Sequence, residues 1–191
     1  WKALAENVLV KRWKGKMLEA CKNGETKIVQ LLLERFNSEE SGVNIQDNNG
    51  FNALMVACKK GNKDVVQLLL DDSERNIDLN ARNNGGLTAF MVACARGRKN
   101  VVQLLLDNLE RNIDLNARSD VGRTALMFAC LNGHTDVVQL LLDHSERIEM
   151  NARNNDGFTA FMIACTNGHT DVVRLLLDNS ERNIDLNARC N

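Results

Sequence analysis

The strongest constraint on the fold is an internal repeat. A highly similar stretch occurs four times and a degenerate one once, beginning at Met17, Asn52, Thr88, Thr124 and Thr159. One cysteine keeps the register of the four similar copies, at spacings of 36, 36 and 35 residues: Cys58, Cys94, Cys130 and Cys165. A period in this range is typical of stacked supersecondary units. The repeat therefore limits the fold before any local motif does.

Each copy predicts two short helices. Ala89–Cys94 is apolar all round, which is typical of a helix buried on most sides, and Thr88 before it is a good N-cap. Gly97 then breaks the chain, and Val101–Leu106 predicts a second helix with only Gln103 facing water. Such a unit cannot bury its apolar surface alone, so it needs neighbouring copies.

One copy carries a family resemblance. Asp156–Cys165, then Gly168-His169, then Val172–Leu177 resembles the ankyrin repeat, and the likeness extends over about residues 14–191. The resemblance implies an all-α solenoid of about five stacked helix-turn-helix repeats with β-turn fingers. This chain departs from the family at Thr-Pro-Leu-His, which becomes Thr-Ala-Leu-Met or Thr-Ala-Phe-Met, and it contains no proline.

We therefore expect a single domain over residues 1–191. The expected repeats cover about residues 14–46, 47–82, 83–118, 119–153 and 154–191. Residues 1–13 predict a capping helix, because apolar side chains recur at helical spacing at Trp1, Leu4, Ala5, Val8 and Leu9. A basic helix lying on a membrane surface is the alternative for this segment. The fifth repeat lacks a polar cap, so we expect the native stack to continue past it.

Turns separate the predicted repeats. Asx- or Ser-initiated turns that end in glycine should form the fingers, at 47–50, 83–86, 119–122 and 154–157. After the second helices, Asn76, Asn112 and Asn183 stand where the family has glycine, and we expect left-handed backbone there. Arg147 takes this place in the fourth repeat, whose shorter connector should have a different geometry.

Composition excludes several classes of function. The net charge of −1 gives no basis for attraction to nucleic acid or membranes. The longest apolar run, Ala53–Cys58, is too short to span a bilayer. Five cysteines occupy equivalent helix positions, roughly 8–10 Å apart in packed helices, beyond the limit of about 7 Å for a disulfide. We expect buried free thiols in a reducing cytoplasm, with only Cys190 exposed.

The sequence contains no catalytic or metal-binding constellation. His134 and His169 occupy one repeat position and are predicted to close the turn between helices. They should lie too far apart to share a metal, whose ligand bonds are near 2 Å. No nucleophile–base pair, phosphate loop or zinc-type cysteine pair is present. We expect no enzymatic activity, no metal and no cofactor.

Recognition of another protein remains. Positions that vary between copies are not dictated by the scaffold, and in the family they line the concave face and the fingers. The residue after each turn glycine and the end of each first helix vary in this way. Phe51, Leu87 and Phe158 are expected to form an apolar row open to water, with charged neighbours. The alternative is that these side chains pack along the fingers.

Charge is expected to differ between the two sides of the stack. Arg82, Arg118, Arg153 and Arg189 precede the turns and should form a column near the concave face, opposite acidic connectors. The predicted partner is an acidic or mixed extended protein segment bound by a monomer; the alternative is that each arginine pairs with a nearby carboxylate. The predicted contact residues are Phe51, Lys59, Lys60, Arg82, Leu87, Arg96, Arg118, Arg123, Leu131, Arg153 and Phe158.

Two other functions stay open. The chain could be a regulatory domain of a larger enzyme or channel. It could also be an artificial repeat scaffold, which near-identical copies favour and uneven repeat lengths disfavour.

Overall fold

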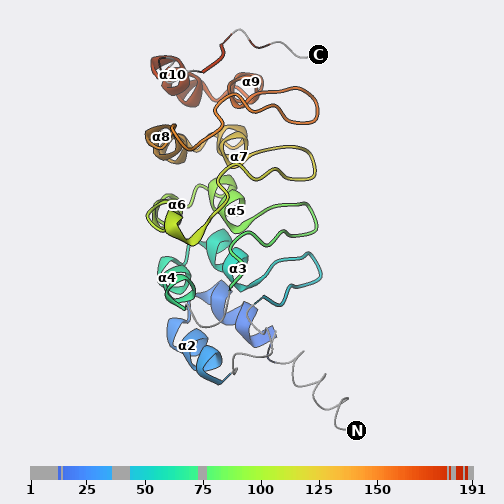
Figure 1. Cartoon of the computed structure of the whole chain (residues 1–191), viewed down its shortest axis with the longest axis vertical. Coiled ribbons are helices and arrows are strands. Elements are labelled where there is room, and N and C mark those ends of the chain that lie inside the picture. The colour runs from blue at the N-terminus through green and yellow to red at the C-terminus, as the bar shows by residue number, and fades with distance from the viewer. Residues whose placement is uncertain are drawn as a thin grey trace.

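Five helical pairs stack along one axis in the computed structural model, which describes residues 13, 15–35, 44–72, 77–179, 181, 184–186 and 188. Helical residues 15–23 pair with α2 (Thr26–Arg35). The later pairs are α3 (Ala53–Lys60) with α4 (Lys63–Asp71), α5 (Ala89–Ala95) with α6 (Lys99–Leu106), α7 (Ala125–Leu131) with α8 (Thr135–Asp143), and α9 (Ala160–Thr166) with α10 (Thr170–Asp178). First and second helices form two parallel columns, and the fingers project beside the first helices (Figure 1). The all-α repeat fold is confirmed.

Local capping sets the start of each first helix. The side-chain oxygen of Thr88 accepts the N–H of Met91 at 3.3 Å. Asn52, Thr124 and Thr159 act in the same way in their own repeats. Each bond satisfies one of the N–H groups that a helix start leaves without a partner. The predicted first helix at Ala89–Cys94 is confirmed and extends by one residue.

The core is one continuous layer between the columns. All five apolar residues of α6 are buried, namely Val101, Val102, Leu104, Leu105 and Leu106. Gln103 is half-buried rather than open to water, and its Nε2 donates to Asp107 Oδ1 at 2.8 Å. In the described residues no helix is long and apolar enough to cross a membrane.

The cysteines divide into two groups. Cys21, Cys58, Cys94 and Cys130 are buried free thiols, as expected from their register. Cys165 is also a free thiol but is exposed, so the prediction of five equivalent buried cysteines is wrong at this position. The first helix of the following repeat packs on α3, α5 and α7, which carry Cys58, Cys94 and Cys130, and α9 is the last first helix described.

The fingers are hydrogen-bonded hairpins joined to one another. In one finger, Asn83 N–H donates to the Leu87 carbonyl, Gly86 N–H donates to the Asn83 carbonyl, and Asn83 Oδ1 accepts the Leu87 N–H at 2.9 Å. Asn84 N–H continues to the carbonyl of Asn49 in the preceding finger at 3.1 Å. Equivalent links join the later fingers. The predicted β-turn fingers are confirmed.

Connectors after the second helices carry a ladder of asparagines. Asn116 Oδ1 accepts the Glu149 N–H and its Nδ2 donates to the Arg147 carbonyl, each at 2.8 Å. Asn80 makes the same two bonds to Asp114 and Asn112. The side-chain amide of one asparagine thus links each connector to the next. These bonds take the place of backbone-to-backbone hydrogen bonds between the connectors.

The expected left-handed residue is present at Asn112, whose φ is 57°. The fourth connector differs, as its shorter length predicted: turns cover residues 144–147, and among described non-glycine residues only Asn112 has positive φ. Predictions for residues 1–12, Asn76, Asn183, Arg189 and Cys190 fall outside the described residues.

A second tie joins the helix-hairpin turns of neighbouring repeats. The residue after the turn glycine donates a side-chain hydrogen bond to a carbonyl at the end of the preceding first helix. The donors and acceptors are Asn62 to Cys21 and Lys22, Arg98 to Lys59, His134 to Ala95 and His169 to Leu131. The histidines therefore bind the neighbouring repeat, whereas the sequence predicted that they close their own turn.

Candidate protein-binding surface

The candidate surface lies where fingers and first helices meet. It is defined by two positions in each repeat: the finger base, which follows the turn glycine, and the last residues of the first helix. The Nζ of Lys59 lies 4.7 Å from the ring centroid of Phe51. In the second repeat, therefore, the finger base and the end of the first helix are in contact.

The finger-base residues are less open than the sequence predicted. Phe51, Leu87 and Phe158 are half-buried and pack against the core, and so does Leu131 at the end of α7. A row of fully open apolar side chains is therefore not present. The alternative, that these side chains pack against the protein, holds for the buried part of each side chain.

Arg123 interrupts this apolar series. It is half-buried at the finger base, and its Nε is a buried side-chain nitrogen without a hydrogen-bond partner. An N–H group in that state costs free energy, of order 1–3 kcal/mol for a typical buried donor. Because this nitrogen is buried, a bound ligand would not reach it without a rearrangement of the Arg123 side chain.

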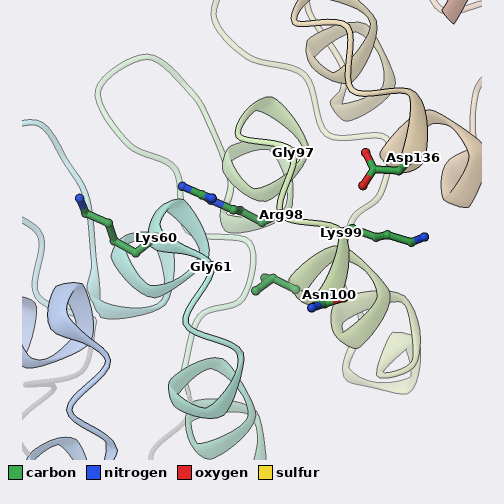
Figure 2. A pocket seen from close by; sticks show the side chains of 8 residues that line it. Lys60, Gly61, Gly97, Arg98, Lys99, Asn100 and Asp136 are labelled. Atoms are coloured by element: carbon green, nitrogen blue, oxygen red, sulfur yellow. The ribbon is translucent and has the colours of Figure 1, made fainter. Parts of the chain in front are cut away.

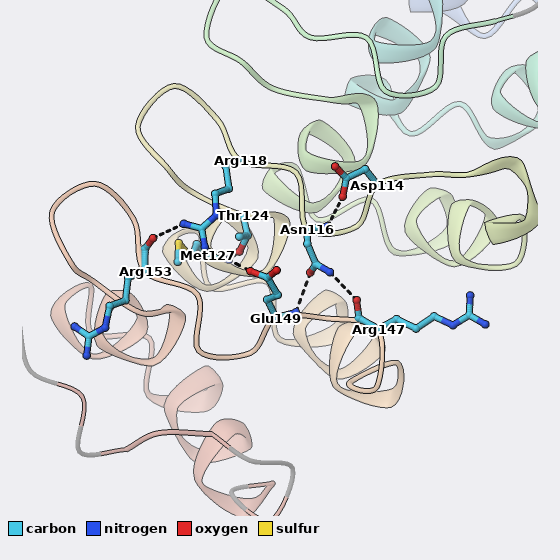
Figure 3. A network of polar contacts seen from close by, with 8 residues as sticks. All are labelled: Asp114, Asn116, Arg118, Thr124, Met127, Arg147, Glu149 and Arg153. Carbon is cyan, nitrogen blue, oxygen red and sulfur yellow. Dashed lines mark hydrogen bonds and ion pairs between the residues drawn. The ribbon is translucent and has the colours of Figure 1, made fainter.

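The arginine column is occupied by contacts within the stack. Arg82 Nη2 forms an ion pair with Asp120 at 3.1 Å, and Arg118 Nη2 pairs with Glu149 at 3.4 Å. Arg118 Nη1 also donates to the Arg153 carbonyl at 2.6 Å, beside the Asn116 bonds to the next connector (Figure 3). The alternative of carboxylate pairing is thus found at Arg82 and Arg118, and these arginines connect neighbouring repeats.

Arg153 and the exposed cations complete the predicted set. Arg153 Nη1 donates to the Gly157 carbonyl of its own finger at 3.1 Å. Lys60 and Arg96 are exposed at the ends of α3 and α5. Lys60 also lines a hollow of about 400 Å³ with Arg98, Lys99 and Asp136 (Figure 2).

Sequence comparison of the copies missed two residues of this hollow. Lys99 and Asp136 begin the second helices of successive repeats, outside the positions that resemblance to the family singles out. The available signal was the contrast in charge between Arg98-Lys99 and the corresponding His134-Thr135.

The chemical groups of the described residues set what this surface can do. No group of three or more metal-ligating side chains occurs among the described residues. Desolvation raises the pKa of the buried thiols Cys21 and Cys130 to about 12, so these thiols stay protonated and are poor nucleophiles near neutral pH. The surface offers exposed cations, partly open apolar groups and an arginine with an unsatisfied donor.

Comparison with known proteins agrees with this geometry. A family model that describes three copies of the ankyrin repeat matches residues 17–119 and again residues 111–190. No curated protein matches the sequence significantly.

Proposed function

The chain belongs to the ankyrin-repeat family, whose members generally bind proteins, and on that premise we propose that it is a non-catalytic scaffold that binds a partner protein. The proposed contact surface is formed by the finger bases and the ends of the first helices. The chain acts as a monomer in the reducing cytoplasm, and the free thiols favour that compartment.

One observation carries the proposal. The scaffold bonds are the same from repeat to repeat, with a capped first helix, a closed finger and ties to the next unit. The side chains at the contact positions nevertheless differ in size and charge, as in Leu87 against Arg123 and Lys59 against Leu131. Packing does not dictate these differences, so they are available to specify a partner.

Three of the predicted contact residues have a changed role in this proposal. Arg82 and Arg118 are committed to carboxylates of the stack, and Arg153 to a finger carbonyl. They position the fingers beside the proposed contact surface. Arg123 brings a positive charge into the otherwise apolar series of finger bases, and its half-buried side chain is partly open to a partner.

A paired-variant capture experiment tests the proposal. The surface variant combines Arg123→Ala with Leu131→Gln, and the control combines Arg174→Ala with Leu177→Gln on the exposed side of α10. Both pairs make the same chemical changes, and thermal unfolding verifies that both variants fold. Each protein is immobilised and exposed to lysate of the native source, and retained proteins are compared by mass spectrometry.

We expect at least one protein to be retained by the wild type and the control but lost from the surface variant. Isothermal titration with that purified protein should then give a weaker affinity for the surface variant only. If the surface variant retains every protein that the control retains, the proposed contact surface is wrong.

A further inference from the structure

Charge along the helix-hairpin turns changes sign halfway up the stack. We call these turns the hairpin edge, which runs in each repeat from the end of the first helix to the start of the second. In the second and third repeats the hairpin edge carries Lys59, Lys60, Lys63, Arg96, Arg98 and Lys99, with Asp64 as the one acid. In the fourth and fifth repeats it carries Asp136 and Asp171, with no lysine or arginine.

The structure concentrates the basic half around one hollow. Lys60 and Gly61 come from the α3–α4 turn, and Gly97, Arg98 and Lys99 from the α5–α6 turn (Figure 2). Arg98 is held in place because its Nε donates to the Lys59 carbonyl at 3.1 Å. Its side chain passes over Gly61, where an added Cβ would lie 2.9 Å from Arg98 Cδ. The position of this guanidinium is therefore fixed before any ligand binds.

The cations of the hollow differ from Arg82 and Arg118 in their ion pairing. Arg82 and Arg118 form ion pairs, but within the described ranges no ion pair involves Lys60, Arg98 or Lys99. All three cations line the same hollow. A carboxylate that entered it would meet positive charge without displacing an existing ion pair, and an arginine fork can bind a carboxylate through two hydrogen bonds.

We infer that the hairpin edge of the second and third repeats binds an acidic segment of the partner protein, with the segment's acidic residues over Lys60, Arg98 and Lys99. The inference rests on the proposed function and adds the chemistry and location of one part of the partner. Asp136 closes the far side of the hollow. The segment should therefore bear a cation, or end its acidic run, where it reaches the fourth repeat.

The same charge pattern argues against nucleic acid as the occupant. Duplex DNA carries a negative charge about every 1.7 Å along its axis and would continue past the basic half. It would then meet Asp136 and Asp171, which repel phosphate. A peptide can confine its negative charge to the length of two repeats, so an acidic peptide fits and a uniform polyanion does not.

Designed peptides test this inference without a known partner. The probe is a fluorescein-labelled peptide with an acidic half of alternating Glu and Gly and a basic half of alternating Lys and Gly. Controls are a Gln-for-Glu peptide, an all-acidic peptide of the same length, and a double-stranded DNA oligonucleotide. Fluorescence anisotropy gives each affinity at about 50 mM and about 300 mM salt, since screening distinguishes charge contacts.

Two variants of equal net charge distinguish binding at the hollow from attraction by the overall charge of the protein. Lys60→Glu with Lys99→Glu reverses the basic hollow, while Arg147→Glu with Arg174→Glu reverses two exposed cations elsewhere. We expect the first variant to bind the half-acidic peptide about tenfold or more weakly and the second to bind within about twofold of wild type. Asp136→Lys should strengthen binding of the all-acidic peptide.

Several results would overturn the inference. These are no preference for the half-acidic peptide over its Gln version, equal losses in the two charge variants, or tighter binding of DNA than of either acidic peptide. The proposed function would survive each of them, because its own test uses Arg123 and Leu131 rather than the hollow. Conversely, if the test with Arg123 and Leu131 fails while the acidic peptide still binds, the proposed contact surface is wrong and the acidic-peptide site stands by itself.

Discussion

His134 donates a hydrogen bond from Nε2 to the main-chain carbonyl of Ala95 in the preceding repeat, at 3.2 Å. A carbonyl oxygen only accepts, so the bond fixes the proton on Nε2 in this imidazole. Asn62 and Arg98 place quite different donors at the same point of their own repeats. The scaffold therefore needs a donor at this position and does not need a histidine.

His134→Ala should lower the free energy of unfolding by about 1 kcal/mol, the typical net contribution of one hydrogen bond. His134→Asn should recover most of that loss, because Asn62 donates to the equivalent carbonyl, that of Lys22, in another repeat. Urea unfolding of the three proteins measures the difference. Equal destabilisation by Ala and Asn would show that packing of the imidazole matters more than its hydrogen bond.

Gly133→Ala should destabilise the protein more than Gly168→Ala. Both glycines have left-handed backbone, with φ of 69° and 70°, so both variants share the cost of placing alanine there, about 1 kcal/mol. An added Cβ at Gly133 would lie 2.6 Å from His169 Nδ1, whereas Gly168 has open space. Thermal unfolding of the two variants isolates the contact, and equal shifts in the melting temperature would contradict this prediction.

Native thiol labelling should distinguish Cys165 from the buried cysteines. In a Cys190→Ser background, Cys165 is exposed and should react with a disulfide reagent at the rate of a free thiol near pH 8. Cys130 should react only as fast as the stack opens, because it is buried and its pKa is raised to about 12 by desolvation. Labelling followed by peptide mass spectrometry reads each site. Fast labelling at Cys130 would mean that the core is open.

The raised thiol pKa values also predict a loss of stability at alkaline pH. In the unfolded chain these thiols ionise near pH 8.5, whereas Cys21 and Cys130 in the fold keep their protons until about 12. The unfolded state thus binds fewer protons in this window, and stability falls as pH rises from about 8.5 to 12. Replacing Cys21 and Cys130 by Ala should flatten this dependence, as measured by urea unfolding at several pH values.

Local features of the sequence were sufficient to predict the repeat fold. Thr88 begins α5 as a cap, Gly97 follows its end, and Val101–Leu106 is buried, because each feature depends on residues close in the chain. The role of Arg82 could not be predicted in the same way. Its partner Asp120 is 38 residues away, and their contact depends on how far one repeat rotates against the next.

The accessibility of the predicted contact residues could not be read from the sequence. Phe51 and Lys59 belong to the same repeat, and the contact between them depends on how the finger lies against α3. The half-burial of Phe51, the unsatisfied Nε of Arg123 and the convergence of Lys99 with Asp136 depend on side-chain packing between repeats. A one-dimensional pattern does not specify such packing. Cys165 shows the same limit, since its exposure depends on whether another unit covers it.

The asparagine ladder described above has a mechanical consequence. Asn80 and Asn116 each clasp only the adjoining connector, and the turn donors and finger bonds likewise reach one unit back. A force applied along the long axis would therefore act on these links in series, one repeat interface after another. Under such tension the molecule should lengthen in steps of one unit rather than fail all at once.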